Sequence, residues 1–129
     1  MTTRGSGAEH TALLVMVHGS PRPEANADML RVVELVRQQA VFCIVVAAFM
    51  ECNEPSIPTG IDLCAASGAT EIVAVPYFLH TGTHVAEDLP TLLDAGRTAF
   101  PHITFKLGRY LGCSPHVTEI LAQRIEEAT

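Results

Sequence analysis

The sequence predicts a three-layer α/β domain, in which helices cover both faces of a four-stranded parallel sheet. Apolar runs of strand length alternate four times with segments of helical periodicity. Such strict alternation requires parallel strands joined by right-handed crossovers. The chain has 129 residues, of which 48% are hydrophobic and 17% are charged, so it can fill one compact core.

The N-terminal half holds two of the four strand-helix units. The first strand is expected over residues 12–17. The helix after it, over 24–39, has apolar residues at helical spacing, namely Ala25, Met29, Val32, Val33 and Val36. The second strand, over 41–49, is a β-branched apolar run typical of sheets covered on both faces. The second helix covers 57–67, and Gly68 follows it at a position suited to a left-handed cap.

The C-terminal half repeats the pattern. A third strand is expected over residues 71–77, followed by a helix over 84–95 with Thr83 as its N-cap and Gly96 as its closing residue. The fourth strand covers 102–107. The last helix begins where Ser114 caps it and Pro115 occupies its first turn, and it ends near residue 127.

Residues 1–10 are rich in Gly, Ser and Thr, and we expect a flexible tail before a single domain over 11–129. The tail has no apolar signal-peptide core, and no stretch is long and apolar enough to span a membrane. The four cysteines form no CxxC pair, which gives little support for a zinc site or redox couple. Cys43 and Cys64 lie in apolar segments and are expected in the core. We therefore expect a cytoplasmic protein with reduced thiols.

The formal net charge of -6 argues against nucleic acid or an anionic membrane as a partner. A polyanionic ligand would need arginines placed close to it. Arg22 and Arg109 are candidates, because both follow predicted strands and both could bind carboxylates through paired hydrogen bonds. The alternative for each arginine is an ordinary solvated surface charge.

Residues that can bind a metal ion or transfer a proton lie in the loops after the strands. These loops all emerge at one edge of a parallel sheet. His18 ends an apolar run and is followed by Gly19, which allows a tight turn. Glu51 is the first ionisable group after the second strand, and His80 and His84 follow the third. His10, His102 and His116 fall elsewhere and are expected to be ordinary.

Neutral imidazole is a common ligand of transition metals, so His18 is a candidate metal ligand. Its alternative is a strand-end imidazole bonded to backbone. His84 and Asp88 share a helix face, a spacing that suits a carboxylate orienting a metal-binding imidazole or a plain surface pair. A carboxylate such as Glu51, at the rim of an apolar wall, suits proton transfer, or it is a solvated loop acid.

The chain resembles the small class II tetrapyrrole chelatases of the sirohydrochlorin cobaltochelatase and ferrochelatase group. The resemblance rests on segments that recur in the family's order. They are Val17-His18-Gly19-Ser20-Pro21-Arg22-Pro23-Glu24-Ala25-Asn26, Ala48-Phe49-Met50-Glu51, Glu54-Pro55-Ser56-Ile57-Pro58, Val75-Pro76-Tyr77-Phe78-Leu79 and Gly82-Thr83-His84-Val85-Ala86-Glu87-Asp88. Each segment alone is weak, but they recur across almost the whole chain and together are strong.

The resemblance implies a flavodoxin-like half of the chelatase fold and the insertion of a divalent metal into sirohydrochlorin without nucleotide hydrolysis. Cobalt is the expected metal, with iron or nickel as the others that the group uses, on the routes to cobalamin or sirohaem. No permanently bound cofactor is expected. The family's paired histidines fall on His18 and His84, and its strand-end glutamate falls on Glu51, which serves as ligand or base.

The chain departs from the family pattern at Cys52, Asn53 and His80. His80 is either an added metal ligand or a plain substitution. Ser20 and Arg22 after the first strand are candidates for substrate binding, with Arg109 and the backbone N–H groups of Gly82 and Thr83. Because full-length chelatases face two such halves across a cleft, the resemblance also implies a homodimer that recreates the cleft.

Two other classes of function compete with a chelatase. A hydrolase or phosphatase also places histidine and glycine after a strand, but the chain has no GxSxG, and Val17 stands where a histidine phosphatase has arginine. A non-catalytic metal carrier or sensor could use the same histidines. Metal binding without metallation of a tetrapyrrole would identify the carrier.

Overall fold

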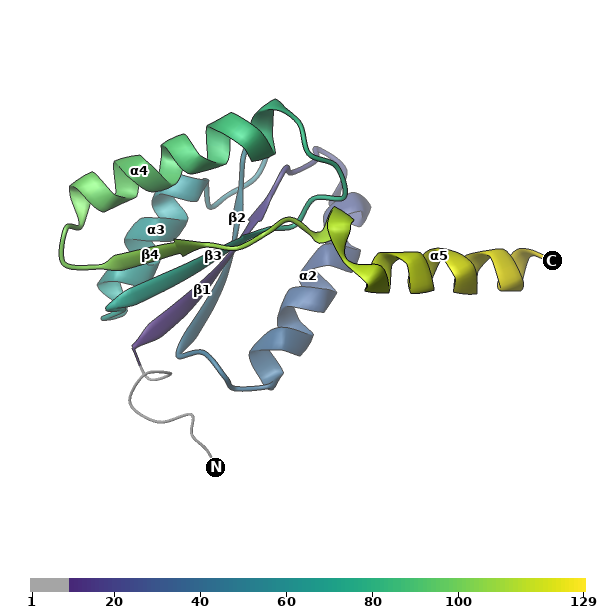
Figure 1. Ribbon diagram of the computed structural model, residues 1–129. Coiled ribbons are helices and arrows are strands. Elements are labelled where there is room, and N and C mark those ends of the chain that lie inside the picture. Colours follow the sequence, from purple (N-terminus) through teal and green to yellow (C-terminus); the bar gives the residue numbers. More distant parts are fainter. Residues whose placement is uncertain (1–9) are drawn as a thin grey trace.

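A computed structural model describes residues 10–129 and contains one four-stranded parallel sheet flanked by helices (Figure 1). The flexible tail expected over residues 1–10 lies almost wholly outside the described residues. The strand order is β2-β1-β3-β4, so β1 and β3 lie at the centre. The strands are β1 (Thr11–Val17), β2 (Ile44–Phe49), β3 (Glu71–Pro76) and β4 (Thr104–Leu107). The predicted fold class is confirmed.

Six helical segments connect or follow the strands. They are α2 (Pro23–Gln38), α3 (Ile57–Ala66), the π-helical turn η1 (His84–Asp88), α4 (Leu89–Ala99), the short 3-10 turn η2 (Leu111–Cys113) and α5 (Pro115–Ala128). Ser114 caps α5 by accepting a hydrogen bond from the backbone N–H of His116 at 3.2 Å. Gly68 has φ +91° after α3. Both predicted caps are therefore confirmed.

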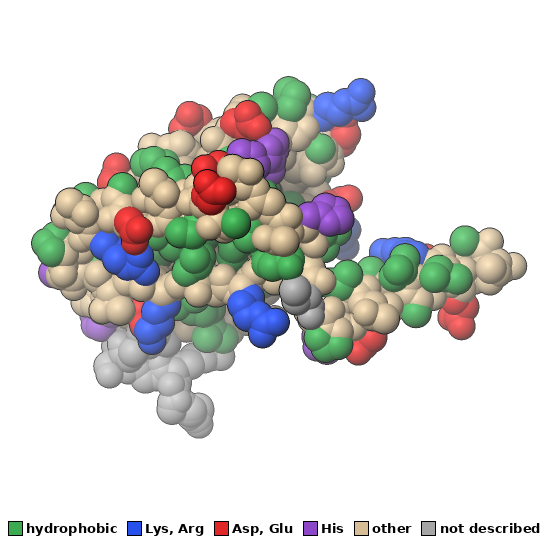
Figure 2. Space-filling view, turned by 45° about the horizontal axis from the view of Figure 1, so that its top comes forward, with side chains coloured by type: hydrophobic (Ala, Val, Ile, Leu, Met, Phe, Trp, Pro, Cys, Tyr) green, Lys and Arg blue, Asp and Glu red, His purple; other side chains and the backbone are tan. Residues whose placement is uncertain are grey.

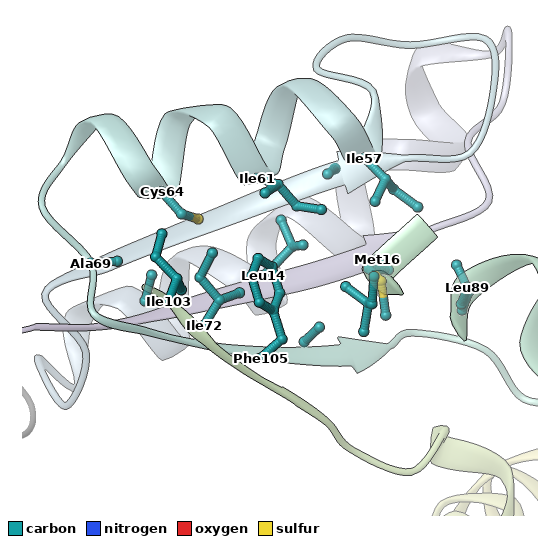
Figure 3. Packing of buried hydrophobic residues seen from close by; sticks show 14 residues of the cluster. Leu14, Met16, Ile57, Ile61, Cys64, Ala69, Ile72, Leu89, Ile103 and Phe105 are labelled. Atoms are coloured by element: carbon teal, nitrogen blue, oxygen red, sulfur yellow. The ribbon is translucent and has the colours of Figure 1, made fainter. Parts of the chain in front are cut away.

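One face of the sheet carries the larger core. Leu14 and Met16 of β1 and Ile72 of β3 are completely buried there beneath α3 and α4 (Figure 3). Residues that alternate with them in β1 point to the opposite face. They form a second cluster with α2, whose Met29 and Val33 are buried. α5 projects away from both layers (Figure 1).

Several predicted boundaries were wrong. The second strand begins at Ile44 rather than at residue 41, because Ala40 takes a left-handed conformation with φ 56° and the chain is still turning. Cys43 is consequently exposed and is not a core residue, although its thiol donates to the Thr11 carbonyl oxygen at 3.1 Å. Cys64 is buried as expected.

The predicted helix over 84–95 also differs from the structure. Thr83 has helical backbone angles and makes no side-chain cap, so it is not the N-cap. Gly96 does not end the helix, which continues to Ala99. A Cβ atom on Gly96 would lie 3.0 Å from the Phe105 ring and 3.1 Å from Ile61. Glycine therefore allows α4 to approach the sheet closely.

Candidate functional site

His18 follows β1 directly and is held by the backbone of the neighbouring loop. The β1–β2 pairing continues past both strands, because Met50 N–H donates to Val17 O at 2.7 Å and Glu51 N–H donates to His18 O at 3.1 Å. Gly19 has φ +96°, and a Cβ atom there would lie 2.1 Å from the Glu51 carbonyl oxygen. Only glycine permits this approach, which brings the His18 and Glu51 loops together.

The side chains of His18 and Glu51 are in contact. His18 Nε2 lies 2.8 Å from Glu51 Oε1, and His18 Nδ1 lies 3.0 Å from the carbonyl oxygen of Gly19. The two side chains are 50% and 55% exposed, so solvent and a ligand can reach both. The exposure also means that the apolar rim expected around Glu51 desolvates it little. The pair is available to a cation or a proton.

His84 is oriented by Asp88 within η1. The Leu89 N–H donates to His84 O, a bond that spans five residues and defines the π-helical turn. Within that turn His84 Nδ1 donates to Asp88 Oδ2 at 2.8 Å. Nδ1 therefore carries the proton, and the Nε2 lone pair of a neutral ring is free to bind a metal. π-helical turns occur often at functional sites.

The two histidines that the sequence singled out lie side by side. The ring centroids of His18 and His84 are 5.3 Å apart, with an angle of 64° between the ring planes. Both rings line a hollow of about 280 Å³, together with Phe78, His80, Thr81, Gly82, Thr83 and Val85. Figure 2 shows histidine side chains near the end of the body from which α5 projects. The structure thus brings together the loops after β1, β2 and β3, as the sequence predicted for the ends of parallel strands.

His80, Gly82 and Thr83 belong to this hollow, whereas the arginines lie outside its lining. Within residues 10–129, no three or more His, Cys, Asp or Glu side chains form a closed group that could hold a metal ion. Arg22 is exposed, with its guanidinium 3.9 Å from Glu24. Arg109 lines a separate hollow of about 310 Å³ with Tyr110, Ser114 and Pro115.

Two asparagines that sequence reasoning did not select hold the loop after His18. Asn53 Oδ1 accepts a hydrogen bond from the Ser20 N–H at 2.9 Å, and Asn26 Nδ2 donates to Ser20 O at 3.1 Å. Asn26 is buried on the same helix face as Met29 and Val33. A polar residue at an apolar position of the helical pattern was the signal that could have identified it.

The histidines expected to be ordinary lie apart from this hollow. His102 stacks edge-on against Phe100, with 6.4 Å between ring centroids, and His116 lies on α5 with Nδ1 3.5 Å from Glu119. Across the described residues, no helix is both long enough and apolar enough to cross a membrane.

Comparison with known proteins gives one family and consistent relatives. The CbiX family model matches residues 12–128. The chain is 34% identical to a sirohydrochlorin cobaltochelatase of Priestia megaterium, over 93% of this chain and 39% of that protein. It is 31% identical to the chloroplastic sirohydrochlorin ferrochelatase of Arabidopsis thaliana, over 88% of this chain and 51% of that protein. The chain thus spans about half or less of these relatives.

A solved structure shares both sequence and fold. The sirohydrochlorin chelatase SirB of Bacillus subtilis subspecies spizizenii, in complex with cobalt, superposes with a TM-score of 0.85 at 27% identity. The match covers 91% of this chain and 50% of that one. The four-stranded unit described above therefore corresponds to about half of that chelatase.

Proposed function

The chain belongs to the CbiX family, and from that premise we propose that it inserts a divalent metal ion into sirohydrochlorin without nucleotide hydrolysis. The observation that carries the proposal is the close pair of His18 and His84, each held by its own carboxylate, at the rim of one hollow. The named relatives include a cobaltochelatase and a ferrochelatase. We propose cobalt as the metal, with iron or nickel as alternatives.

The nitrogen donors suit a metal ion that binds and is then released to the tetrapyrrole. His84 offers Nε2 because Asp88 holds the proton on Nδ1. His18 offers Nε2 when the cation replaces the proton between this nitrogen and Glu51. Both rings stay about half exposed, so the tetrapyrrole can approach the bound metal ion. His80 lines the same hollow and is a candidate for a further ligand.

Metal insertion also releases two protons from the pyrrole nitrogens. One divalent cation enters the macrocycle and two N–H protons leave, so the charge balances. Glu51 Oε1 is the proposed acceptor, because it already faces a ring nitrogen and the solvent. A histidine that has given up the metal is a second acceptor.

The carboxylates of the substrate need cationic partners outside the hollow. Among the described residues Arg109 forms no recorded ion pair, and it borders a hollow at the start of α5. Arg22 lies after β1 beside Ser20, whose hydroxyl accepts a bond from the Arg22 N–H at 3.1 Å. We propose that both guanidinium groups bind carboxylates, assisted by Ser20 and the N–H groups of Gly82 and Thr83.

A second copy of the chain would supply the opposite wall. The hollow of about 280 Å³ lies at the lower limit of the roughly 300–1,000 Å³ typical of small-molecule sites. A tetrapyrrole needs more enclosure than this hollow gives. A two-fold homodimer would face two such hollows across a cleft. The cytoplasmic location and the domain boundary at residue 11 stay predictions.

The test is the anaerobic insertion of Co²⁺ into sirohydrochlorin, followed by absorbance. We expect His18→Ala and His84→Ala to slow insertion by at least about 100-fold. Loss of a residue that only orients a metal ligand costs up to about 100-fold, and loss of the ligand itself should cost at least as much. His102→Ala, far from the hollow, is the control and should insert at the normal rate. Unchanged rates in both site variants would refute the proposed site. Cobalt binding by the wild type without insertion would identify a carrier or sensor instead.

Asp88 tests the orientation of His84 separately. We expect Asp88→Ala to weaken Co²⁺ binding by about 10–100-fold, because the His84 ring loses the partner that fixes its tautomer. Asp88→Asn keeps an acceptor oxygen and should recover part of the affinity. Asp94→Ala, which removes an acid paired with Arg97 on α4, is the matched control. Titration calorimetry with Co²⁺ measures all three variants, and equal affinities for them would contradict the assigned role.

A further inference from the structure

Two asparagines from different elements hold the same residue, Ser20, from both sides. Asn26 lies in the first turn of α2, and its Nδ2 donates to Ser20 O at 3.1 Å. Asn53 lies in the loop after β2, and its Oδ1 accepts a hydrogen bond from the Ser20 N–H at 2.9 Å. The Ser20 hydroxyl accepts a third bond, from the Arg22 N–H at 3.1 Å. Every polar group of Ser20 therefore has a partner.

These bonds belong to a closed ring that joins the loops after β1 and β2. The Glu51 N–H donates to His18 O at 3.1 Å, and the Asn53 N–H donates to Glu51 O at 2.9 Å. Asn53 Oδ1 then returns to Ser20, two residues after His18. The bond between Asn53 and Glu51 spans only two residues and places Cys52 at φ 71°, a conformation that costs free energy outside glycine. This tight turn fixes the position of Asn53 relative to Glu51.

The buried position of Asn26 indicates that its amide serves the contact with Ser20. Asn26 is 8% exposed and lies on the face of α2 that also buries Met29 and Val33. An apolar side chain would fill such a position at a smaller desolvation cost, so a buried amide needs a hydrogen-bond partner. Ser20 O is that partner. The His18 ring, by contrast, is half exposed, so its direction depends on the backbone of the turn to which Ser20 belongs.

We propose that Asn26 and Asn53 are positioning residues of the metal site, because together they fix the turn that follows His18. The inference rests on the proposed function, since this is the site assigned to cobalt. With the turn fixed, His18 Nε2 stays 2.8 Å from Glu51 Oε1, and its ring stays 5.3 Å from the ring of His84. A ligand that is already in place loses less conformational freedom when the metal ion binds. The two asparagines thus raise the affinity for the metal ion without being ligands themselves.

The affinity for Co²⁺, measured by titration calorimetry, tests this role. Asn53→Ala removes the acceptor for the Ser20 N–H and should weaken Co²⁺ binding by about 10-fold, the lower end of the loss for residues that orient a metal ligand. Asn53→Asp keeps an acceptor oxygen and should recover most of that affinity. Asn26→Leu removes the donor to Ser20 O but keeps a side chain of similar size on the buried face of α2. It should also weaken Co²⁺ binding by about 10-fold.

Met29→Ala is the matched control for stability. Met29 is buried one turn further along the same face of α2 as Asn26. Its truncation should lower the melting temperature more than Asn26→Leu does, while the Co²⁺ affinity of the folded protein stays at the wild-type value. Asn26→Leu should show the reverse pattern, with a small change in melting temperature and a large change in affinity. Asn53→Ala changes a loop residue, so the test does not depend on the folding of either helix variant.

A double variant separates positioning from general damage to the fold. In the His18→Ala protein the turn has no ring to direct, so adding Asn26→Leu should change the remaining Co²⁺ affinity by less than about two-fold. Damage to the fold would instead lower the affinity by the same factor in both backgrounds. The Ser20 amide gives a readout that needs no metal. Its hydrogen exchange, followed by NMR, should accelerate in Asn53→Ala and stay slow in Asn53→Asp.

Three results would overturn the positioning role. Wild-type Co²⁺ affinity in both Asn53→Ala and Asn26→Leu, while His18→Ala binds weakly, is one. An equal loss for Asn26→Leu with and without the His18 ring is another, since it indicates damage to the fold. An Asn53→Asp variant as weak as Asn53→Ala is the third. If the variants weaken Co²⁺ binding as expected but the wild type inserts no metal into sirohydrochlorin, the positioning role stands and only the proposed activity fails.

Discussion

The two faces of the sheet differ in how completely the chain covers them. On the face beneath α3 and α4, Leu14 and Met16 have no exposed surface (Figure 3). On the other face, Leu13 and Val15 of the same strand border an open groove. Neighbouring residues of one strand thus have different surroundings. The first face is packed within the chain, and the second is only half covered.

The site depends on the packed face. Val85 of η1 packs against the larger core cluster, and Leu89 directly after η1 is fully buried in it. His84 is therefore fixed by the packing of α4 on the sheet. The half-covered face carries the groove instead. Substitutions on the packed face should consequently lower the stability of the fold more than substitutions on the half-covered face.

The largest expected difference is between two leucines of β1. Leu14→Ala should lower the free energy of unfolding by up to about 5 kcal/mol, because it leaves a cavity in a packed core. Leu13→Ala should cost closer to about 2 kcal/mol, because Leu13 lacks neighbours on the groove side. Urea unfolding of both variants makes the comparison. Equal losses would mean that the two faces are equally packed.

Thiol reactivity should distinguish the packed core from its margin. Burial, with a smaller contribution from Cys43, raises the pKa of the Cys64 thiol from 9.0 to about 11. Its thiolate fraction at about pH 8 is therefore about 100-fold lower than for an ordinary thiol of pKa 9. We expect iodoacetamide to label the exposed Cys43 and Cys52 at least 100-fold faster than Cys64, as measured by peptide mass spectrometry. Comparable labelling of Cys64 would show that this core opens readily.

The smallest effect concerns a polar pair in β3 and β4. Lys106 Nζ lies 2.7 Å from Glu71 Oε2, and this hydrogen bond holds the pKa of Glu71 below its ordinary value despite partial burial. The pair therefore stabilises the fold above the ordinary pKa of glutamate, and the contribution is lost as the pH falls through the lowered pKa.

Glu71→Gln should lower the free energy of unfolding at pH 7 by about 0.2–1 kcal/mol, because Lys106 is largely exposed. Its deficit should shrink as the pH is lowered toward about 3. Thermal unfolding of both proteins across this range measures the change. Glu119→Gln, on the exposed surface of α5, is the control. A deficit that grows with acidity would contradict the sign of the pKa shift.

The period of the apolar pattern predicted the fold well. Four strand-helix units, their order and the caps at Gly68 and Ser114 follow from residues that act locally. One error has a tertiary cause and the other a local one. Gly96 looked like a helix end, but its missing side chain serves the contact with Phe105 in a distant strand. The strand after Ala40 starts late because a non-glycine residue takes a left-handed conformation there.

The candidate site likewise contains residues that the sequence could predict and one that it could not. His18, Glu51 and His84 could be selected because parallel strand ends share an edge, and the structure brings them together. Asn53 was treated as a departure from the family pattern, yet its Oδ1 holds the Ser20 backbone. That contact spans 33 residues, so spacing along the sequence carried no sign of it.

The π-helical turn at the site differs from an ordinary helical start by one residue. An α-helix would close the bond to the His84 carbonyl at Asp88, whereas η1 closes it at Leu89. Deleting one residue between His84 and Asp88 would restore α-helical closure and shift the carboxylate to three residues from the ring. In genetic terms, loss of a single codon would turn this start into an ordinary α-helix and change how the acid meets the histidine, although both would stay on one face of the helix.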